Sequence, residues 1–264
     1  MEPHRVIAIG RTAEVYPWND RQVLKLFRPE WPDEAVEREA SIARAVWEAG
    51  LPAPSVGDLL EVEGRRGLIL ERIDGPSLGT TTGARPWTVL RAARALADLH
   101  AQIHDKRVPA LRSQRESLRS QIDAAPDLPG RTREAVLDVL ARRPHGEQLC
   151  HGDFHPENVL VTNGGMTVID WFCASQGNPA ADVARSSLLL TAAAPLSSPI
   201  PTWLLEGGRR LFHRAYLKRY LDLRPTDRDE LRLWQPVIAA ARLAECIPEE
   251  KDRLVKLICR GLAI

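Results

Sequence analysis

The sequence predicts an α+β fold, in which a small antiparallel β-sheet with one helix precedes a mostly helical part. Short β-type runs separated by turn residues fill the N-terminal stretch. Longer stretches with apolar residues at helical spacing dominate from residue 86 onward. Between these helices, two short apolar runs flank a glycine-rich turn. The chain therefore divides into a strand-rich N-terminal part and a mostly helical remainder.

Length and composition bound the class of protein. The 264 residues, 44% of them hydrophobic, are enough for a sizeable core in one large unit or in two lobes. The net charge of +1 produces no global field that would attract nucleic acid or a membrane, and we expect neither as a partner. The most apolar late stretch, Leu188 to Leu205, is interrupted by three prolines and is not expected to span a membrane.

The cysteines indicate the compartment. They are scattered, with no CxxC pair and no spacing typical of a zinc site. We expect reduced, mostly buried thiols of a cytoplasmic protein at Cys150, Cys173, Cys246 and Cys259.

The first strands form a predicted meander. Three β-type runs cover Val6–Ile9, Glu14–Tyr16 and Gln22–Phe27, with turns expected at Gly10–Thr12 and Pro17–Asp20. Two further runs, about residues 57–62 and 67–70, meet across a turn at 63–64 and complete a five-stranded sheet.

A helix is predicted between the third and fourth strands. It runs from about Glu34 to Ala49, with Asp33 as its N-cap and Gly50 just after its end. Lys25 lies among apolar residues of the preceding strand, and a buried ammonium needs a partner. Glu39 falls within the apolar stripe of the helix, whereas Glu37 falls on the opposite face. Glu39 is therefore the expected partner of Lys25.

The C-terminal part is predicted to be helical. Helices are expected over about Pro86–His104, Arg131–Arg142, Pro201–Leu221, Thr226–Cys246 and Pro248–Gly261. A further amphipathic helix carries arginines 112, 115 and 119 on one face, which we interpret as a solvated face rather than an anion-binding patch. His100 is expected to be a hydrogen-bonded core histidine.

The centre of the chain concentrates the chemistry. Two predicted strands, residues 159–162 and 166–169, flank a hairpin signal at Asn163-Gly164-Gly165. A tight hairpin would bring Asp153 and Asn158 close to Asp170. Oxygen ligands on short loops, with a proton acceptor among them, suit a site that handles Mg²⁺ and phosphate.

The same stretch allows another interpretation. His151, Asp153 and His155 alternate along the chain, so in an extended segment they could ligate a transition metal, as in a metallohydrolase. No second cluster of His and Asp supports this reading, and it leaves Asn158 and Asp170 unexplained. We favour the phosphate site.

The central motifs resemble those of a known family. His-Gly-Asp-Phe-His-Pro-Glu-Asn at 151–158, followed by Val-Ile-Asp-Trp at 168–171, resembles the catalytic core of the aminoglycoside phosphotransferase and choline kinase family. These are small-molecule relatives of protein kinases. The resemblance implies a bilobal protein-kinase-like fold. ATP would lie between a nucleotide-binding lobe over residues 1–72 and a catalytic, acceptor-binding lobe over residues 73–264.

The resemblance also implies roles for particular residues. Asp153 would orient the acceptor hydroxyl and take its proton late, while Asn158 and Asp170 would hold Mg²⁺. Lys25, held by Glu39, would position the α- and β-phosphates of ATP.

The remaining nucleotide contacts are implied in the same way. Gly10 would match one glycine of the kinase glycine-rich loop. The backbone C=O of Glu71 and N–H of Ile73 would bind adenine. Asp182, in a segment that resembles the family's G-D-P-x-x-D-L-A, would bind the backbone of the catalytic loop, and His151 would be structural.

The expected activity is transfer of the ATP γ-phosphate to a hydroxyl of an aminoglycoside, amino alcohol or sugar. For a cationic acceptor, Glu245, Glu249 and Glu250 are candidate contacts, although surface solvation is the favoured interpretation of each. A protein kinase is disfavoured because no Asp-Phe-Gly or Ala-Pro-Glu follows Asp170 before Asp182. A non-catalytic, regulatory nucleotide-binding relative remains open because the glycine loop is sparse.

Overall fold

A computed structural model describes residues 6–192 and 202–262 of the chain. The chain divides into two compact units. Unit 1 comprises Met1–Thr81 and Glu157–Phe172, and unit 2 comprises Thr82–Pro156 and Cys173–Ile264. The central hairpin therefore groups with the N-terminal strands. The lobes expected over 1–72 and 73–264 stay a prediction.

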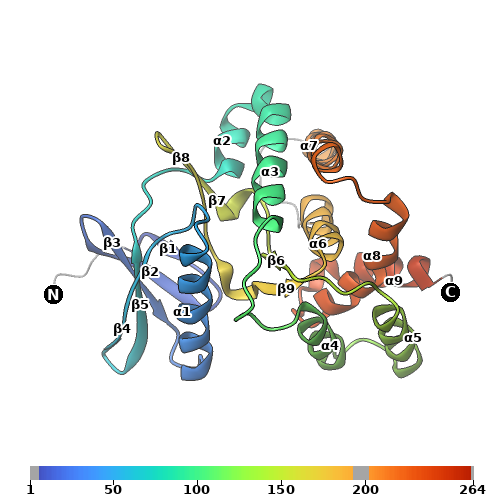
Figure 1. Cartoon of the computed structure of the whole chain (residues 1–264), viewed down its shortest axis with the longest axis horizontal. Helices are drawn as coiled ribbons and strands as arrows, with labels where there is room; N and C mark the ends of the chain where they lie inside the picture. Colours follow the sequence, from blue (N-terminus) through green and yellow to red (C-terminus); the bar gives the residue numbers. More distant parts are fainter. Residues whose placement is uncertain (1–5, 193–201, 263–264) are drawn as a thin grey trace. The chain divides into compact units, whose positions relative to one another are not determined.

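Unit 1 contains the predicted five-stranded antiparallel sheet. Its strands are β1 (Ala8–Ile9), β2 (Ala13–Asn19), β3 (Gln22–Phe27), β4 (Val56–Val62) and β5 (Arg65–Glu71). They lie in the order β1-β2-β3-β5-β4, and every neighbouring pair is antiparallel (Figure 1). The α+β prediction is thus confirmed for this part of the chain.

One predicted turn of this sheet is found in the structure, and another is not. Glu63 and Gly64 both have positive φ, 53° and 74°, as a tight hairpin between β4 and β5 requires. The turn predicted to begin at Pro17 is wrong, because β2 continues through it with a register irregularity beyond. β1 pairs only with Val15 and Glu14, so the missing N–H of Pro17 breaks no hydrogen bond on that side.

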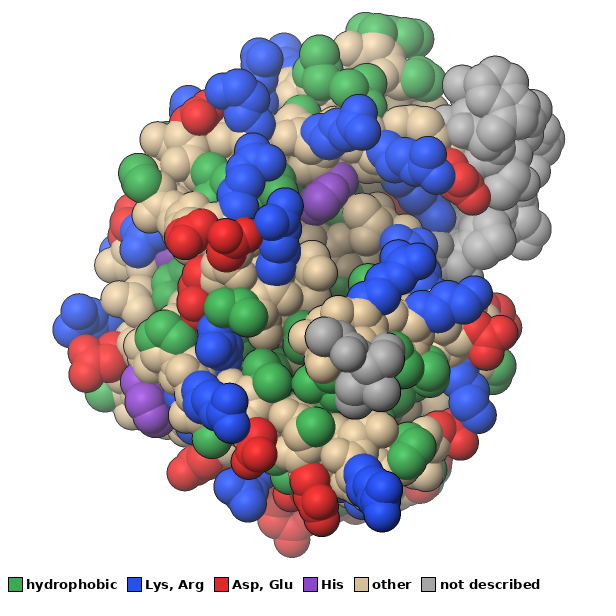
Figure 2. Space-filling model, turned by 90° about the vertical axis from the view of Figure 1, so that its right-hand side faces the viewer, with side chains coloured by type: hydrophobic (Ala, Val, Ile, Leu, Met, Phe, Trp, Pro, Cys, Tyr) green, Lys and Arg blue, Asp and Glu red, His purple; other side chains and the backbone are tan. Residues whose placement is uncertain are grey.

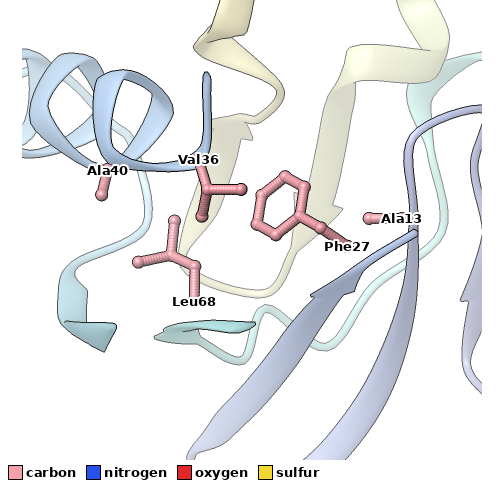
Figure 3. Packing of buried hydrophobic residues seen from close by; sticks show 5 residues of the cluster. All are labelled: Ala13, Phe27, Val36, Ala40 and Leu68. Atoms are coloured by element: carbon pink, nitrogen blue, oxygen red, sulfur yellow. The ribbon is translucent and has the colours of Figure 1, made fainter. Parts of the chain in front are cut away.

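Helix α1 (Asp33–Glu48) covers one face of the sheet (Figure 1). Its Val36 and Ala40 pack against Phe27 and Leu68 from the strands (Figure 3). Full burial of such side chains stabilises the fold by roughly 1.5–3 kcal/mol each. This contact fixes the phase of α1, and so decides which of its glutamates faces β3.

The ends of α1 differ slightly from the prediction. The N-cap is Pro32, with no side-chain cap, and not Asp33. Asp33 instead lies in the first turn, where its carboxylate favours the positive end of the helix dipole. Gly50 follows the helix with φ of 75°, a left-handed conformation that suits glycine after a helix.

The central hairpin also belongs to unit 1. Strands β7 (Val159–Thr162) and β8 (Gly165–Val168) are antiparallel, and Thr162 faces Gly165 across a loop of two residues. The hairpin prediction is confirmed, with β8 starting one residue early. The N–H of Val168 donates to the C=O of Pro52 at 2.7 Å, which ties the hairpin to the segment after α1.

Unit 2 is mostly helical. Its helices are α3 (Val89–His104), α4 (Gln114–Ala124), α5 (Gly130–Ala141), α6 (Pro179–Ala192), α7 (Thr202–Leu223), α8 (Arg228–Leu243) and α9 (Lys251–Leu262). A short antiparallel pair, β6 (Gln148–Cys150) and β9 (Ser175–Gly177), flanks the catalytic motif. The six helices predicted for this part are confirmed, except that α4 begins at Gln114, so Arg112 precedes the helix and does not share its face with Arg115 and Arg119. α6, and α2 (Leu78–Ala84) at the boundary of the units, had not been predicted.

Two expectations concern residues around the undescribed segment. The predicted helix start at Pro201 and the middle of the apolar stretch 188–205 lie outside the described residues. Within the described ranges, no helix combines the length and the apolarity that a membrane span needs.

The cysteines are free thiols. The expectation that most are buried is wrong. Cys150 is buried, Cys246 is exposed, and Cys173 and Cys259 are intermediate.

Candidate active site

Three of the predicted site residues meet in unit 1. Lys25 extends from β3 and forms an ion pair with Glu39 of α1, as the sequence predicted. The side chains of Lys25 and Glu39 are only 15% and 7% exposed. The Lys25 Nζ also lies 3.7 Å from Oδ1 of Asp170. Glu37, by contrast, is 62% exposed and lies near Arg66.

The opposite charges of Lys25 and its two carboxyl neighbours, Glu39 and Asp170, favour each other's ionised forms. Burial lowers the pKa of Lys25, but the attraction of Glu39 and Asp170 outweighs it, so the pKa is raised. Burial raises the pKa of Glu39, and the Lys25 ammonium opposes that shift. Lys25 thus remains an ammonium held between two carboxyl groups.

Asp170 and Asn158 lie at the base of the β7–β8 hairpin. The N–H of Ile169 donates to the C=O of Asn158 at 2.9 Å, which fixes the two segments side by side. Asp170 has a φ of 63°, an uncommon conformation for a residue with a side chain, and its carboxyl group is about half exposed. Such strain costs on the order of 1–3 kcal/mol and is typical of functional sites.

The proposed catalytic carboxylate, Asp153, lies in unit 2. Its Oδ1 is 3.3 Å from Nη2 of Arg185, and its Oδ2 is 3.5 Å from Nε2 of His155. Burial raises the pKa of Asp153, but His155 and Arg185 outweigh it and hold the pKa well below its usual range. Asp153 is therefore ionised near neutral pH. The sequence predicts that Asp153 lies close to Asn158 and Asp170, which belong to unit 1. That closeness stays a prediction.

Asp182 of α6 holds the backbone before Asp153, as the sequence predicted. Its carboxylate accepts hydrogen bonds from the N–H of His151 at 2.7 Å and the N–H of Gly152 at 2.9 Å. Gly152 has a φ of 81°, and an added Cβ would collide with the chain at Cys173. Glycine is therefore required where the loop turns toward Asp153.

Two buried histidines complete the environment of Asp182. The Nε2 atoms of His100 and His104 donate to its Oδ2 at 3.1 and 3.2 Å. Their Nδ1 atoms accept hydrogen bonds of 2.6 Å from Tyr216 and Tyr220. His100 is thus a hydrogen-bonded core histidine, as expected. His104 and the tyrosines escaped the sequence analysis, although His100 and His104 share a helical face.

These contacts bear on the metallohydrolase interpretation. Within residues 6–192 and 202–262, the one group of three His, Cys, Asp or Glu side chains with converging ligand atoms is His100, His104 and Asp182. Its carboxylate is already bonded to four N–H donors. The alternating set at 151, 153 and 155 does not converge, because the Nδ1 of His151 accepts the N–H of Asp153.

Two of the three glutamates near the end of the chain are not the solvated surface residues that the sequence analysis had expected. Arg185 reaches Oε1 of Glu245 at 2.5 Å, and Arg242 reaches its Oε2 at 2.6 Å. Arg242 also binds buried Glu250 through two hydrogen bonds, of 2.8 and 3.0 Å. Surface solvation is therefore wrong for Glu245 and Glu250, although Glu249 is exposed. Arg185 and Arg242 were missed, and only the spacing of Arg242, in the last turn of α8, and Glu245 just beyond it hinted at a pair.

The predicted nucleotide contacts of unit 1 lie in separate places. Gly10 forms the turn between β1 and β2, where its N–H donates to the C=O of Ala13. Glu71 ends β5 opposite Gln22 of β3, the strand that carries Lys25. Ile73 follows β5 in the segment that leads out of the sheet. Their roles stay predictions.

Solved structures show the same fold. A thermostable mutant of aminoglycoside phosphotransferase APH(4)-Ia, in a ternary complex with AMP-PNP and hygromycin B, is 19% identical with a TM-score of 0.65, over 99% of this chain and 91% of that chain. An aminoglycoside-3'-phosphotransferase of type VIII is 21% identical with a TM-score of 0.64, over 90% and 93%. A choline/ethanolamine kinase family protein from Mesorhizobium loti is 19% identical with a TM-score of 0.60, over 99% and 87%. The fold is that of protein-kinase-like phosphotransferases.

The family is shown by a comparison with family models. The model described as the phosphotransferase enzyme family matches residues 4–234. The chain belongs to this family of phosphotransferase enzymes. Among curated proteins, no sequence matches the chain.

Proposed function

We propose that this enzyme transfers the γ-phosphate of ATP to a hydroxyl of a small molecule, with Mg²⁺ as the metal. The observation that carries the proposal is the buried Lys25–Glu39 pair with Asp170 beside the ammonium. A protected cation on a rigid strand suits the negative charge of nucleotide phosphates. The free thiols support the further proposal that the protein acts in the cytoplasm.

On this proposal, unit 1 holds the nucleotide. Lys25, oriented by Glu39, binds the α- and β-phosphates, and the turn at Gly10 lies over them. The backbone of Glu71 and Ile73 binds the adenine ring.

Asn158 and Asp170 are the residues that would hold the metal. An amide oxygen and a carboxylate on short segments fit Mg²⁺, which prefers oxygen ligands. When bound, Mg²⁺ would neutralise part of the negative charge of the phosphates. The left-handed backbone at Asp170 supports a functional constraint on this side chain.

Asp153 orients the acceptor. Its carboxylate accepts a hydrogen bond from the hydroxyl and aligns the oxygen for in-line attack. Because its pKa is low, Asp153 is a weak base and takes the proton only late, when the new bond to phosphorus has acidified the hydroxyl. Aminoglycosides, amino alcohols and sugars are the acceptor types proposed, and the ligands in similar structures, such as hygromycin B, support a small molecule.

The test is ADP release from Mg·ATP with a panel of acceptors, using Asp153→Asn as the blank. We expect Asp153→Asn to lower kcat by about 10²- to 10⁴-fold, because it removes the orienting carboxylate, while the KM for ATP changes little. Near-normal turnover by this variant would show that Asp153 has another role. If no acceptor is turned over while Mg·ATP still raises the Tm, the regulatory alternative replaces the proposed activity.

A further inference from the structure

A small hollow opens in unit 2 beside Gly152, the residue that precedes Asp153. Its volume is about 50 Å³. Besides Asp182, its polar lining consists of two arginines, two amide side chains and two hydroxyl side chains: Arg112, Arg185, Gln114, Gln121, Ser117 and Ser175. The chemistry offered by this lining is mainly that of hydrogen-bond donors.

Two arginines bring positive charge to the hollow, and Arg185 is already paired with the carboxylates of Asp153 and Glu245. Asp182 is the one carboxylate in its lining, and it is 1% exposed and bonded to four N–H donors. The neighbouring carboxylate of Glu245 is bound by Arg185 and by Arg242. Arg112 is exposed, and its side chain contributes to the rim.

Arg185 connects the hollow to the proposed catalytic carboxylate. It lines the hollow, and its Nη2 lies 3.3 Å from Oδ1 of Asp153. Its side chain is only 12% exposed, and its Nε has no hydrogen-bond partner among the described residues. A guanidinium has five N–H donors in a planar fork, so Arg185 can serve Asp153, Glu245 and a further oxygen. One guanidinium would thus contact both a group in the hollow and the carboxylate that orients the hydroxyl.

We infer that the acceptor carries an anionic group, a carboxylate or a phosphate, beside its reactive hydroxyl, and that Arg112 and Arg185 bind this group in the hollow. The inference rests on the proposed function and names its class of acceptor. Arginine recognises both groups through paired, charge-assisted hydrogen bonds. The hollow is small, so it would take one such group while the rest of the acceptor lies outside it.

A polycationic acceptor suits these residues poorly. Glu245 and Glu250, which could bind ammonium groups, are already bound by arginines. Breaking such pairs to bind a new cation would leave a partly buried arginine without its counter-charge. Of the acceptor types proposed above, we therefore expect sugar-like compounds with an anionic group to be preferred over amino alcohols and aminoglycosides.

The experiment compares acceptors by charge in the ADP-release assay, with the full-length enzyme. Glycerate and gluconate test acceptors with a carboxylate, and glucose 6-phosphate tests an acceptor with a phosphate. Glucose and inositol are the neutral acceptors. Choline and hygromycin B are the cationic acceptors. Turnover confined to an anionic arm is the expected result, and the arm identifies the group. Turnover of neutral or cationic compounds alone overturns the inference and leaves the proposed function standing. Turnover of none overturns both.

Matched variants test the hollow itself. Arg112→Gln should raise the KM for the anionic acceptor about 10- to 100-fold, the loss expected for one charge-assisted hydrogen bond, and leave kcat and the KM for ATP unchanged. The control is Arg119→Gln, an arginine that is 69% exposed and lies near Asp123 on α4, outside the hollow. Equal KM values for the two variants would overturn the inference. An unchanged Tm of Arg112→Gln shows that its fold is intact.

Discussion

At the scale of single residues, the ammonium of Lys25 is the most constrained charge of unit 1. It is largely buried, it forms an ion pair with Glu39, and it has Asp170 as a second neighbour. Removing one partner of a buried ion pair leaves the other charge without compensation. Loss of stability and loss of nucleotide binding therefore need to be separated experimentally at this position.

Lys25→Met is expected to lower kcat by about 10²- to 10³-fold and to raise the KM for ATP, because a preorganised cation is lost. It should also lower the free energy of unfolding by about 3–5 kcal/mol, since Glu39 stays buried without its partner. Steady-state kinetics and urea unfolding measure the two effects.

The double variant Lys25→Met/Glu39→Leu separates them. It removes both charges, so most of the stability should return while the activity does not. Glu37→Gln, on the exposed face of α1, is the control and should change neither quantity. Recovery of activity in the double variant would contradict a direct role of Lys25 with the nucleotide.

At the scale of elements, two helices fix the loop that carries Asp153. α6 presents Asp182 and Arg185 one turn apart, so the first holds the loop backbone and the second contacts the side chain of Asp153. α3 presents His100 and His104, also one turn apart, to the same Asp182 carboxylate. The loop position therefore depends on how α3 and α6 pack against α7, and not on the loop sequence alone.

Asp182→Asn should displace the loop. The variant places an NH₂ group against N–H donors, and each buried donor left without an acceptor costs about 1–3 kcal/mol. We expect a loss of about 3 kcal/mol or more in urea unfolding, together with a lower kcat at a nearly unchanged KM for ATP.

The control for this prediction is Asp98→Asn on α3. Asp98 forms a partly exposed ion pair with Arg219, which contributes at most about 1 kcal/mol. If Asp182→Asn costs no more than this control, the hydrogen bonds of Asp182 do not determine the position of the loop.

At the scale of the whole molecule, both signs of charge are spread over the surface. Figure 2 shows Asp and Glu side chains among Lys and Arg on one face, with Lys and Arg gathered around a hollow in its upper half. This agrees with the net charge of +1. Self-repulsion at neutral pH is accordingly small, and the pH dependence of stability should come from particular buried groups.

The buried histidines should make the protein less stable in mild acid. Burial, with a contribution from His104, lowers the pKa of His100 from 6.5 to about 4. Between these values the unfolded chain binds a proton that the folded chain does not, so stability is fully present above pH 6.5 and falls as the pH drops toward 4. The expected loss from His100 is on the order of 3 kcal/mol.

Urea unfolding at several pH values between 7 and 4.5 measures this loss. His100→Asn should flatten the pH dependence, although it lowers stability overall. His145→Asn, at an exposed histidine, should leave the slope unchanged. A wild-type stability that is constant over this range would contradict the prediction.

The sequence by itself determined the elements of the fold and part of the site. The five strands, α1 and the central hairpin follow from periodicity and turn residues, which act over a few residues. The choice of Glu39 over Glu37 as the partner of Lys25 was also predictable, because helical phase decides which face is buried. Local errors such as the turn expected at Pro17 arose where strand pairing decided the outcome.

Only the tertiary structure decided how the surroundings of Asp153 are charged. Arg185 and Glu245 are 60 residues apart, and neither position differs locally from an ordinary charge on a helix. The packing of α6 against α8 brings Arg185 close to Glu245, which follows α8, and the expected surface charge of Glu245 becomes part of a bridge that ends at Asp153. An ion pair between distant segments leaves no periodic trace in the sequence, because it depends on where two helices meet and not on the pattern within either.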